Sequence, residues 1–269
     1  MKRTAPLLFY ISLLATAANG MASASAADLS ARDIMEKNFF VTKISTVKSD
    51  ATMILTNDKG QTRERKSSTL SKLQKNGVDS NLLVKFHTPA DIKGTGFLQL
   101  EHSSGDDDLW IYLPALNKSR RLVANNKKDS FVGSDFSYGD ILLPKVDLYK
   151  HSLLRVETID GHDCYVIESI PRDETVKRDN GYSKKITWVR KDNFLETRVQ
   201  YFDLNGELLK IQTASQHKLV EADTQRWLAL RREMLNRQTG HKTLITFDRV
   251  DAGAPIADEV FTTRAIERE

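Results

Sequence analysis

DATMILTNDKGQTRERKSSTLSKLQK, residues 50–75, decides the fold class of this chain. Two strand-length runs, 50–56 and 62–75, flank the turn NDKG, and a short turn of Asn, Asp and Gly between such runs is typical of a β-hairpin. From this hairpin a period of two continues in both directions, almost from Val47 to Val250, with runs of strand length separated by turn residues. The sequence therefore predicts a mainly β protein of antiparallel strands.

Further strand-length runs follow this hairpin along the chain. Turn dipeptides at 160–161, 180–181, 205–206 and 239–240, each ending in Gly, separate the later runs as in a β-meander. About ten or eleven strands in sequential order would curl an open flat sheet. We therefore expect one deeply curved sheet or incomplete barrel with a hydrophobic hollow on its concave face. The other predicted strands are residues 81–87, 97–101, 109–113, 152–158, 164–170, 184–190, 196–203, 207–218, 224–237 and 241–250.

Two segments depart from the period of two. In residues 29–40, Ser30 can cap a helix and apolar residues such as Ile34 and Phe39 recur at helical spacing, which predicts a short N-terminal amphipathic helix. In residues 114–149 the alternation fails, and Pro, Gly, Asn and Asp stand beside aromatic residues. Long irregular segments are uncommon in compact domains and are often functional. We expect this segment to be an irregular insertion that lies at the mouth of the hollow as a lid.

The N-terminus has the order of a secretory signal peptide. Lys2 and Arg3 precede an apolar run at 6–18, and small residues follow, ending in Ala-Ser-Ala at 24–26. The run is shorter than the roughly 20 residues that cross a bilayer. No cysteine stands near the cut to accept a lipid. We expect residues 1–26 to be a signal peptide, residues 27–269 to form one β domain, and the mature protein to be unanchored in the periplasm.

Charge and cysteine content narrow the function classes. The chain has 40 Lys and Arg against 36 Asp and Glu, and two of the basic residues belong to the predicted signal peptide. The remaining charges nearly balance and alternate in sign, so a nucleic-acid partner is not expected. Cys164 is the only cysteine, which excludes an intramolecular disulfide, and stability must come from a packed core. We expect Cys164 itself to be buried and inert.

The usual sequence motifs of enzymes are missing. The chain has no G-x-S-x-G, H-E-x-x-H, P-loop or G-x-G-x-x-G motif. Its six histidines are spread singly along the chain, and the aspartate run at 106–108 lacks the ligand spacing of a calcium loop. We therefore predict no catalytic residues, no metal site, no cofactor and no enzymatic activity.

Several predicted strands are apolar on both faces. In residues 109–113, with the sequence LWIYL, no polar residue alternates with the apolar ones. Residues 82–84 and 97–98 are likewise apolar at consecutive positions. Such a strand is buried between sheet and helix, or it lines a ligand cavity, and both interpretations stay open.

The same region carries a family resemblance. The motifs are FHTP at 86–89, GTGFL at 94–98, DDLWIYLPAL at 107–116, RR at 120–121, SFVGSDFSYGD at 130–140, Trp188 and DEVFT at 258–262. In these motifs, and in their order along the mature chain, the protein resembles the LolA-like proteins described as outer-membrane lipoprotein-sorting proteins. The resemblance implies a half-open antiparallel β-barrel of about eleven strands with helices as a lid.

The resemblance also implies a function. In the best understood members of the family, the hollow carries the acyl chains of lipoproteins across the periplasm. The subfamily that this sequence is most similar to is associated with RND-type, MMPL-like exporters of lipids. The implied partners are therefore a lipid or acylated lipoprotein, an RND/MMPL-type exporter in the inner membrane and an acceptor in the outer membrane. In the lipoprotein carriers an arginine fastens the lid. No motif of this sequence matches the one that contains that arginine, so no residue here is assigned that role.

Candidate site residues fall into two groups. The predicted lining of the cavity, which a one-residue slip in facing would exchange for its neighbours, is Leu82, Val84, Phe86, Phe97, Trp110, Tyr112, Trp188 and Tyr201. The predicted lid and mouth residues are Arg120, Arg121, Phe131, Asp135, Phe136, Tyr138 and Asp140. The two arginines either pair with an aspartate to fix the loop or, with Lys118, meet anionic headgroups. The three aromatics either seat the loop over the hollow or form a gate that ligand displaces.

Two classes of function follow from this sequence. The first is a periplasmic carrier that binds lipid or lipoprotein acyl chains and moves them towards the outer membrane, together with an RND-type exporter. The second is a non-transporting module that senses a lipid or docks on an exporter. A hydrolase would require a nucleophile, an acid and a base clustered inside the hollow.

Overall fold

The computed structural model describes Met1 and residues 29–268, so the predicted signal peptide lies, apart from Met1, outside the described residues. The described chain folds into one antiparallel sheet of thirteen strands. The strands are β1 (Thr46–Thr56), β2 (Thr62–Leu73), β3 (Ser80–Thr88), β4 (Gly96–Leu100), β5 (Asp108–Leu113), β6 (Lys118–Leu122), β7 (Tyr149–Ile159), β8 (His162–Pro171), β9 (Lys184–Arg190), β10 (Glu196–Phe202), β11 (Leu208–Glu221), β12 (Arg226–Asn236) and β13 (Lys242–Ala252).

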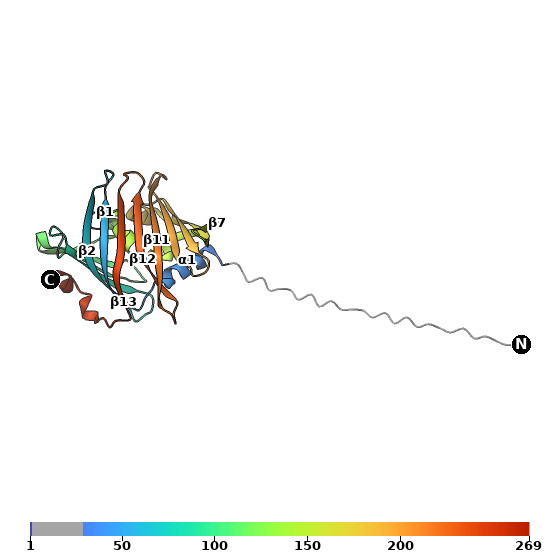
Figure 1. The fold of residues 1–269 in the computed structure, drawn as a ribbon, viewed down its shortest axis with the longest axis horizontal. Helices are drawn as coiled ribbons and strands as arrows, with labels where there is room; N and C mark the ends of the chain where they lie inside the picture. Colours follow the sequence, from blue (N-terminus) through green and yellow to red (C-terminus); the bar gives the residue numbers. More distant parts are fainter. Residues whose placement is uncertain (2–28, 269) are drawn as a thin grey trace.

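The strand order leaves the sheet open at one place. Strands β1 to β6 form one wing and β7 to β13 the other, and the wings join where β1 pairs with β13, from Val47 opposite Ala252 to Thr56 opposite Lys242. The free edges are β6 and β7, which follow each other along the chain. Figure 1 shows β2, β1, β13, β12 and β11 side by side. The predicted fold class, a half-open antiparallel sheet, is confirmed, with thirteen strands where about eleven were expected.

The hairpin predicted for residues 50–75 forms. β1 and β2 pair in continuous register down to Thr56 opposite Thr62. In the turn, Asn57 Oδ1 accepts hydrogen bonds from the backbone N–H groups of Lys59 at 3.0 Å and Gln61 at 2.9 Å. Gly60 has φ +78°, a conformation that L side chains rarely adopt. The turn residues therefore fix the register of both strands.

Strand β6 lies within the predicted insertion. The sequence KSRRL at 118–122 is mostly exposed and pairs with β5 alone at the edge of the sheet. A charged, short edge strand protects the sheet from pairing with other chains, but its charges also hide the alternation that marks other strands. The irregular part of the insertion is therefore shorter than 114–149.

Helices cover the sheet at several places. α1 (Ala31–Val41) begins at Ser30, whose hydroxyl accepts from Asp33 N while the Asp33 carboxylate accepts from Ser30 N, a capping box. This helix confirms the prediction for 29–40 and packs its fully buried Ile34 on Ile167 and Val189 of the sheet. The other helices are η1 (Pro114–Leu116), η2 (Ala124–Lys128), η3 (Phe131–Gly133), α2 (Tyr138–Ile141), η4 (Val146–Leu148), α3 (Glu174–Asn180), η5 (Asp258–Val260) and α4 (Thr263–Glu267).

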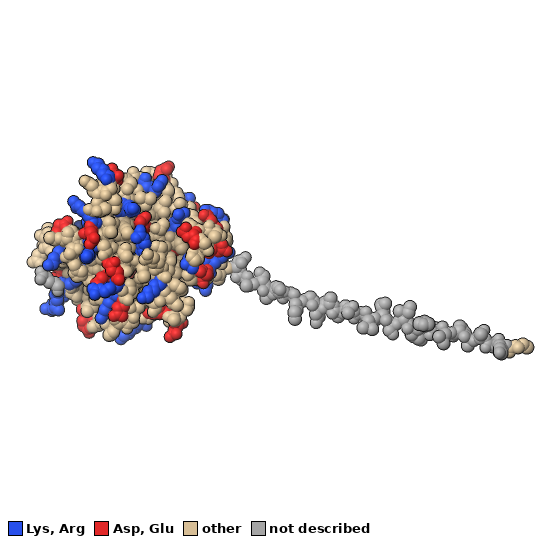
Figure 2. Space-filling model, in the orientation of Figure 1, with Lys and Arg blue, Asp and Glu red and all other residues tan. Residues whose placement is uncertain are grey.

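The segment after β13 covers part of the sheet's other face. Ile256, Phe261 and Ile266 are buried against Leu83 and Leu98, with Trp110 and Tyr112 packed at the side. Acidic and basic side chains are interspersed on the face shown in Figure 2, in keeping with the balanced composition. The strands β3 to β5 thus carry apolar residues on both faces because both faces are covered.

Candidate functional site

A cavity of about 270 Å³ lies between the concave face of the sheet, α1 and residues 139–149 of the insertion. Apolar side chains from all three parts line it, including Met35 and Phe39 of α1, Leu82 of β3, Leu142 of the insertion and Leu228 of β12. Sites for small molecules are mostly apolar, with a few convergent polar groups that fix orientation. This cavity has that composition.

Aromatic residues of the insertion fill the neighbouring part of the hollow. The Phe131 ring lies 5.9 Å from Phe86 and 5.5 Å from Phe97, centroid to centroid, and Tyr138 lies 5.5 Å from both Phe97 and Phe131. Burial raises the pKa of Tyr138 to about 12. Phe136 is fully buried in the same cluster. These rings attach the insertion to β3 and β4, so the cavity occupies only part of the hollow.

A buried ion pair fixes the insertion to the opposite wing. Lys210 Nζ lies 2.6 Å from Asp140 Oδ2, and the Asp140 side chain is fully buried. Asp140 also accepts from Ser137 N at 2.7 Å and from the Tyr182 hydroxyl at 2.9 Å. Burial alone would raise the pKa of Asp140, but Lys210, Lys185 and the hydrogen bonds outweigh burial and hold this pKa below its usual value.

Asp135 adds a second contact nearby. Its carboxylate accepts from the Thr243 hydroxyl at 2.7 Å, and its carbonyl accepts from Lys210 Nζ at 3.0 Å. We refer to Asp135, Asp140, Tyr182, Lys210 and Thr243 as the Asp140 cluster. The cluster joins the insertion to β11, to β13 and to Tyr182 just before β9, which are distant from it in sequence.

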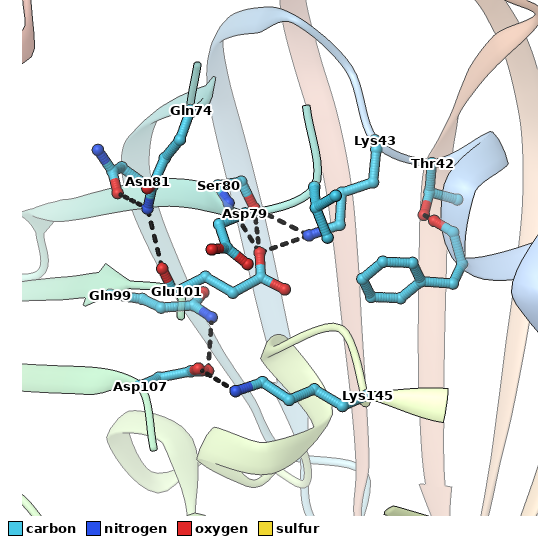
Figure 3. Close-up of polar contacts among 12 residues, drawn as sticks. Thr42, Lys43, Gln74, Asp79, Ser80, Asn81, Gln99, Glu101, Asp107 and Lys145 are labelled. Carbon is cyan, nitrogen blue, oxygen red and sulfur yellow. Dashed lines mark hydrogen bonds and ion pairs between the residues drawn. The ribbon is translucent and has the colours of Figure 1, made fainter. Parts of the chain in front are cut away.

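A second polar cluster fixes the other end of the cavity (Figure 3). Lys145 Nζ lies 2.9 Å from Asp107 Oδ1 and donates to the carbonyl of Gly105 at 2.9 Å. Asp107 in turn accepts from the Gln99 amide at 3.1 Å. The insertion is thereby attached to the turn between β4 and β5.

Lys43, just after α1, makes a buried ion pair with Glu101 in the same region (Figure 3). Glu101 also accepts from Ser80 N at 2.8 Å and from the Ser80 hydroxyl at 2.7 Å. Burial lowers the pKa of Lys43, and Glu101 opposes that effect. This pair fixes the C-terminal end of α1 to β3 and β4, so α1 and the insertion are held over the cavity by separate contacts.

Comparison with known proteins identifies the architecture. A family model described as "Uncharacterized protein" matches residues 78–268, more than half of the chain. A domain from Vibrio parahaemolyticus, described as an outer membrane lipoprotein-sorting protein domain, is 29% identical with a TM-score of 0.81, over 88% of this chain and 98% of that one. A DUF1329 family protein from Desulfovibrio piger is 30% identical with a TM-score of 0.79, over 88% and 97%.

The chain belongs to the DUF1329 family, and its fold is that of the LolA-like proteins. A LolA superfamily protein from Nitrosomonas europaea has the same fold at 21% identity, with a TM-score of 0.66 over 88% of this chain and 99% of that one. No curated protein sequence matches the chain. The family resemblance that the sequence motifs predict is therefore confirmed.

The structure distributes the predicted lining residues of this LolA-like protein over three places. Leu82 and Tyr201 line the cavity. Val84, Phe86 and Phe97 face the same interior but contact the aromatic residues of the insertion. Trp110 and Tyr112 pack on the other face against the C-terminal segment, and Trp188 packs with Cys164 and Val166.

Of the two alternatives for Arg120 and Arg121, pairing with Asp135 or Asp140 does not occur among residues 29–268. Within the described residues, Asp140 pairs with Lys210 and Arg121 pairs with Asp108, its neighbour on β5. Both arginines are exposed at the edge of the sheet, on β6. Phe131, Phe136 and Tyr138 are buried.

Sequence reasoning missed the contribution of α1 and of two late strands to the cavity of this LolA-like protein. Met35 and Phe39 lie on the apolar face of the predicted helix. That apolar face could have indicated that the helix lines the cavity. Lys185 and Trp227 line the cavity from β9 and β12, where nothing in the sequence marks them. Among residues 29–268 no helix is long and apolar enough to span a bilayer, and no three His, Cys, Asp or Glu side chains gather as metal ligands.

Proposed function

We propose that this protein is a periplasmic, non-enzymatic carrier that binds an acyl chain of a lipid or lipoprotein in its cavity and moves it towards the outer membrane. The observation that carries the proposal is the mostly apolar cavity of about 270 Å³ bounded by the sheet, α1 and the insertion. The solved relative that is described as a lipoprotein-sorting domain supports it. Lipid or acylated lipoprotein is the cargo in this proposal.

The cavity suits reversible binding. Each methylene removed from water contributes about 0.8 kcal/mol, so ten methylenes contribute about 8 kcal/mol before the costs of association. Such a value corresponds to a dissociation constant of about 1 µM or weaker. A carrier with this affinity shields an acyl chain from water and still releases it to an acceptor.

The remaining parts of the proposal concern delivery. Export by the signal peptide at 1–26 would place the protein in the periplasm, where an RND/MMPL-type exporter of the inner membrane supplies cargo and an outer-membrane acceptor receives it. The surface in Figure 2, with charges of both signs, suits a protein that crosses an aqueous compartment.

One observation favours the alternative, a module that senses lipid or docks on an exporter without transport. The edge strand β7 exposes Leu153, Leu154 and Val156 to 45%, 45% and 48%. An apolar free edge can accept a strand of another protein. Docking through β7 and transport through the cavity make different predictions for cargo.

Native mass spectrometry of the mature protein purified from the periplasm, followed by lipid extraction, tests the carrier. Ala214 lines the cavity from β11, and Ser215 is exposed on the opposite face of the same strand. We expect discrete acyl-bearing adducts in the wild type and in Ser215→Trp, and their loss in Ala214→Trp, because only the latter fills the cavity. A wild-type protein that has no adduct and takes up no offered lipid would refute transport and favour the docking module.

A further inference from the structure

Lys185 on β9 is a buried cation in the cavity wall that makes no ion pair within the described residues. The residue is 8% exposed. Its Nζ atom lies 5.2 Å from the ring centroid of Tyr149, 5.3 Å from that of Tyr182 and 5.2 Å from that of Tyr201. Aromatic faces stabilise an ammonium group but do not neutralise it. A buried charge without a counter-ion is costly, so this arrangement requires an explanation.

The carboxylates nearest in the fold have other partners. Asp140 accepts from Lys210 and Tyr182, Asp135 accepts from Thr243, and Glu196 accepts from the Gln212 amide at 2.7 Å. Asp140 still attracts Lys185 electrostatically, but the two do not lie within 4.0 Å of each other. The ammonium of Lys185 therefore remains available to an anion inside the cavity.

Neighbouring groups would support such an anion. In the sheet, Ser169 of β8 and Tyr201 of β10 stand opposite Lys185, and both line the cavity. Arg232 also lines the cavity, with its guanidinium donating to Gln212 Oε1 at 3.0 Å and to the Asp140 carbonyl at 3.4 Å. Ser169 and Tyr201 thus flank Lys185 in the sheet, and Arg232 lines the same cavity.

The rest of the cavity wall is suited to a hydrocarbon chain. Ile44, Val47, Leu143, Trp227 and Leu228 line it together with the apolar residues named above. A volume of about 270 Å³ is just below the roughly 300–1,000 Å³ range of small-molecule sites. A cavity of this volume suits one acyl chain better than several.

We propose that the cavity binds a single-chain anionic amphiphile of the fatty-acid class, with its carboxylate on Lys185 and its chain along the apolar wall. This proposal rests on the proposed carrier function and names its cargo. The carboxylate completes the electrostatics of Lys185, since hydrogen bonds to charged groups are stronger than neutral ones. The apolar wall supplies affinity, and Lys185 supplies selectivity for an acidic head.

Isothermal titration calorimetry with dodecanoate and dodecanol tests the site, because the two probes share a chain and differ in head charge. The variant is Lys185→Met, and Lys184→Met is its matched control, because Lys184 is the adjacent lysine on the other face of β9 and pairs with Glu168. We expect wild type and Lys184→Met to bind dodecanoate at least tenfold more tightly than dodecanol. We expect Lys185→Met to bind dodecanoate about ten- to a hundredfold more weakly and dodecanol as wild type does.

The possible failures are distinguishable. Unchanged dodecanoate affinity in Lys185→Met, with both probes still bound, would overturn the anion site and leave the carrier intact. A wild type that binds neither probe would overturn both. Dodecyl phosphate bound at least tenfold more tightly than dodecanoate would overturn the carboxylate assignment.

Stability measurements separate a binding role from a structural one. Because Lys185 makes no ion pair within 4.0 Å and attracts Asp140 only at longer range, we expect Lys185→Met without ligand to unfold at a urea midpoint close to that of wild type. A destabilised Lys185→Met would assign the lysine a structural role and overturn the proposal. Lys185→Arg retains the cation and should bind dodecanoate within about tenfold of wild type, which provides a test that does not depend on the methionine variant.

Discussion

The buried pair between Asp140 and Lys210 makes a sharp stability prediction. Asp140→Asn keeps the size of the side chain and an acceptor for the Tyr182 hydroxyl. It places either an amide N–H₂ or a weaker neutral acceptor where Oδ2 now meets the Lys210 ammonium and Ser137 N. The Lys210 side chain is 6% exposed, so water cannot replace the lost carboxylate. The variant therefore leaves a buried cation without its counter-ion.

The expected loss is large. Removing one partner of a buried pair costs about 3–5 kcal/mol, against a total stability of about 5–15 kcal/mol for a typical domain. Lys210→Met should cost a similar amount because it leaves Asp140 unpaired. The double variant should lose less than the sum of the two single losses, because neither charge then remains. We expect a coupling energy of about 2 kcal/mol or more.

Urea unfolding monitored by tryptophan fluorescence measures these differences. The matched control is Asp258→Asn, because Asp258 Oδ1 lies 2.6 Å from Lys72 Nζ, the same distance as in the buried pair, but its side chain is 67% exposed. We expect Asp258→Asn to leave the free energy of unfolding unchanged within error, because water solvates both groups. Equal losses in Asp140→Asn and Asp258→Asn, or additive losses in the double variant, would refute the reasoning from burial.

Three further properties can be predicted. The pKa of Asp140 in the folded protein lies below its usual value. The stabilisation that ionised Asp140 gives is therefore complete above the unfolded carboxyl pKa of about 3.9 and is lost as pH falls through the folded pKa. The difference in unfolding free energy between wild type and Asp140→Asn, measured in urea, should accordingly shrink in acid. Ser30→Ala removes the cap of α1 and should cost about 1 kcal/mol in urea unfolding, whereas Ser30→Asp should cost less. The thiol of Cys164 is fully buried and burial raises its pKa, so Ellman's reagent should react slowly with native protein and rapidly in urea; fast native reaction would contradict its burial.

The hairpins of the sheet could be predicted because their signals are local. Asn57 and Gly60 determine the first turn through their own side-chain chemistry and backbone freedom, and both act within a few residues. Strand β6 could not be predicted, because an edge strand with one partner needs no apolar alternation. The presence of a strand there depends on β5, which supplies its hydrogen bonds.

The cavity lining could be predicted only in part. The alternation of a strand places Leu109 and Ile111 on one face of β5 and Trp110 and Tyr112 on the other, but both pairs are apolar. Only the C-terminal segment, which packs on Trp110 and Tyr112, shows which pair faces away from the hollow. One alternative pairs Arg120 or Arg121 with Asp135 or Asp140, all within the predicted insertion. Lys210 of β11 is instead the partner of Asp140. The curvature of the sheet brings these two residues together, although they are 70 positions apart in the sequence.

The pairing of β1 with β13 has a consequence for how the molecule assembles. The wing from β1 to β6 consists of antiparallel pairs between neighbours in the chain, so it can form early and quickly, as can the wing from β7 to β13 once that wing is synthesised. Among the strands of residues 29–268, β13, which joins the two wings by pairing with β1, is synthesised last, and β1 is synthesised first. Until the two meet, β1 presents an unpaired edge that can recruit other chains. We expect this closure to limit the folding rate and the unpaired β1 edge to be where a folding factor protects the nascent protein.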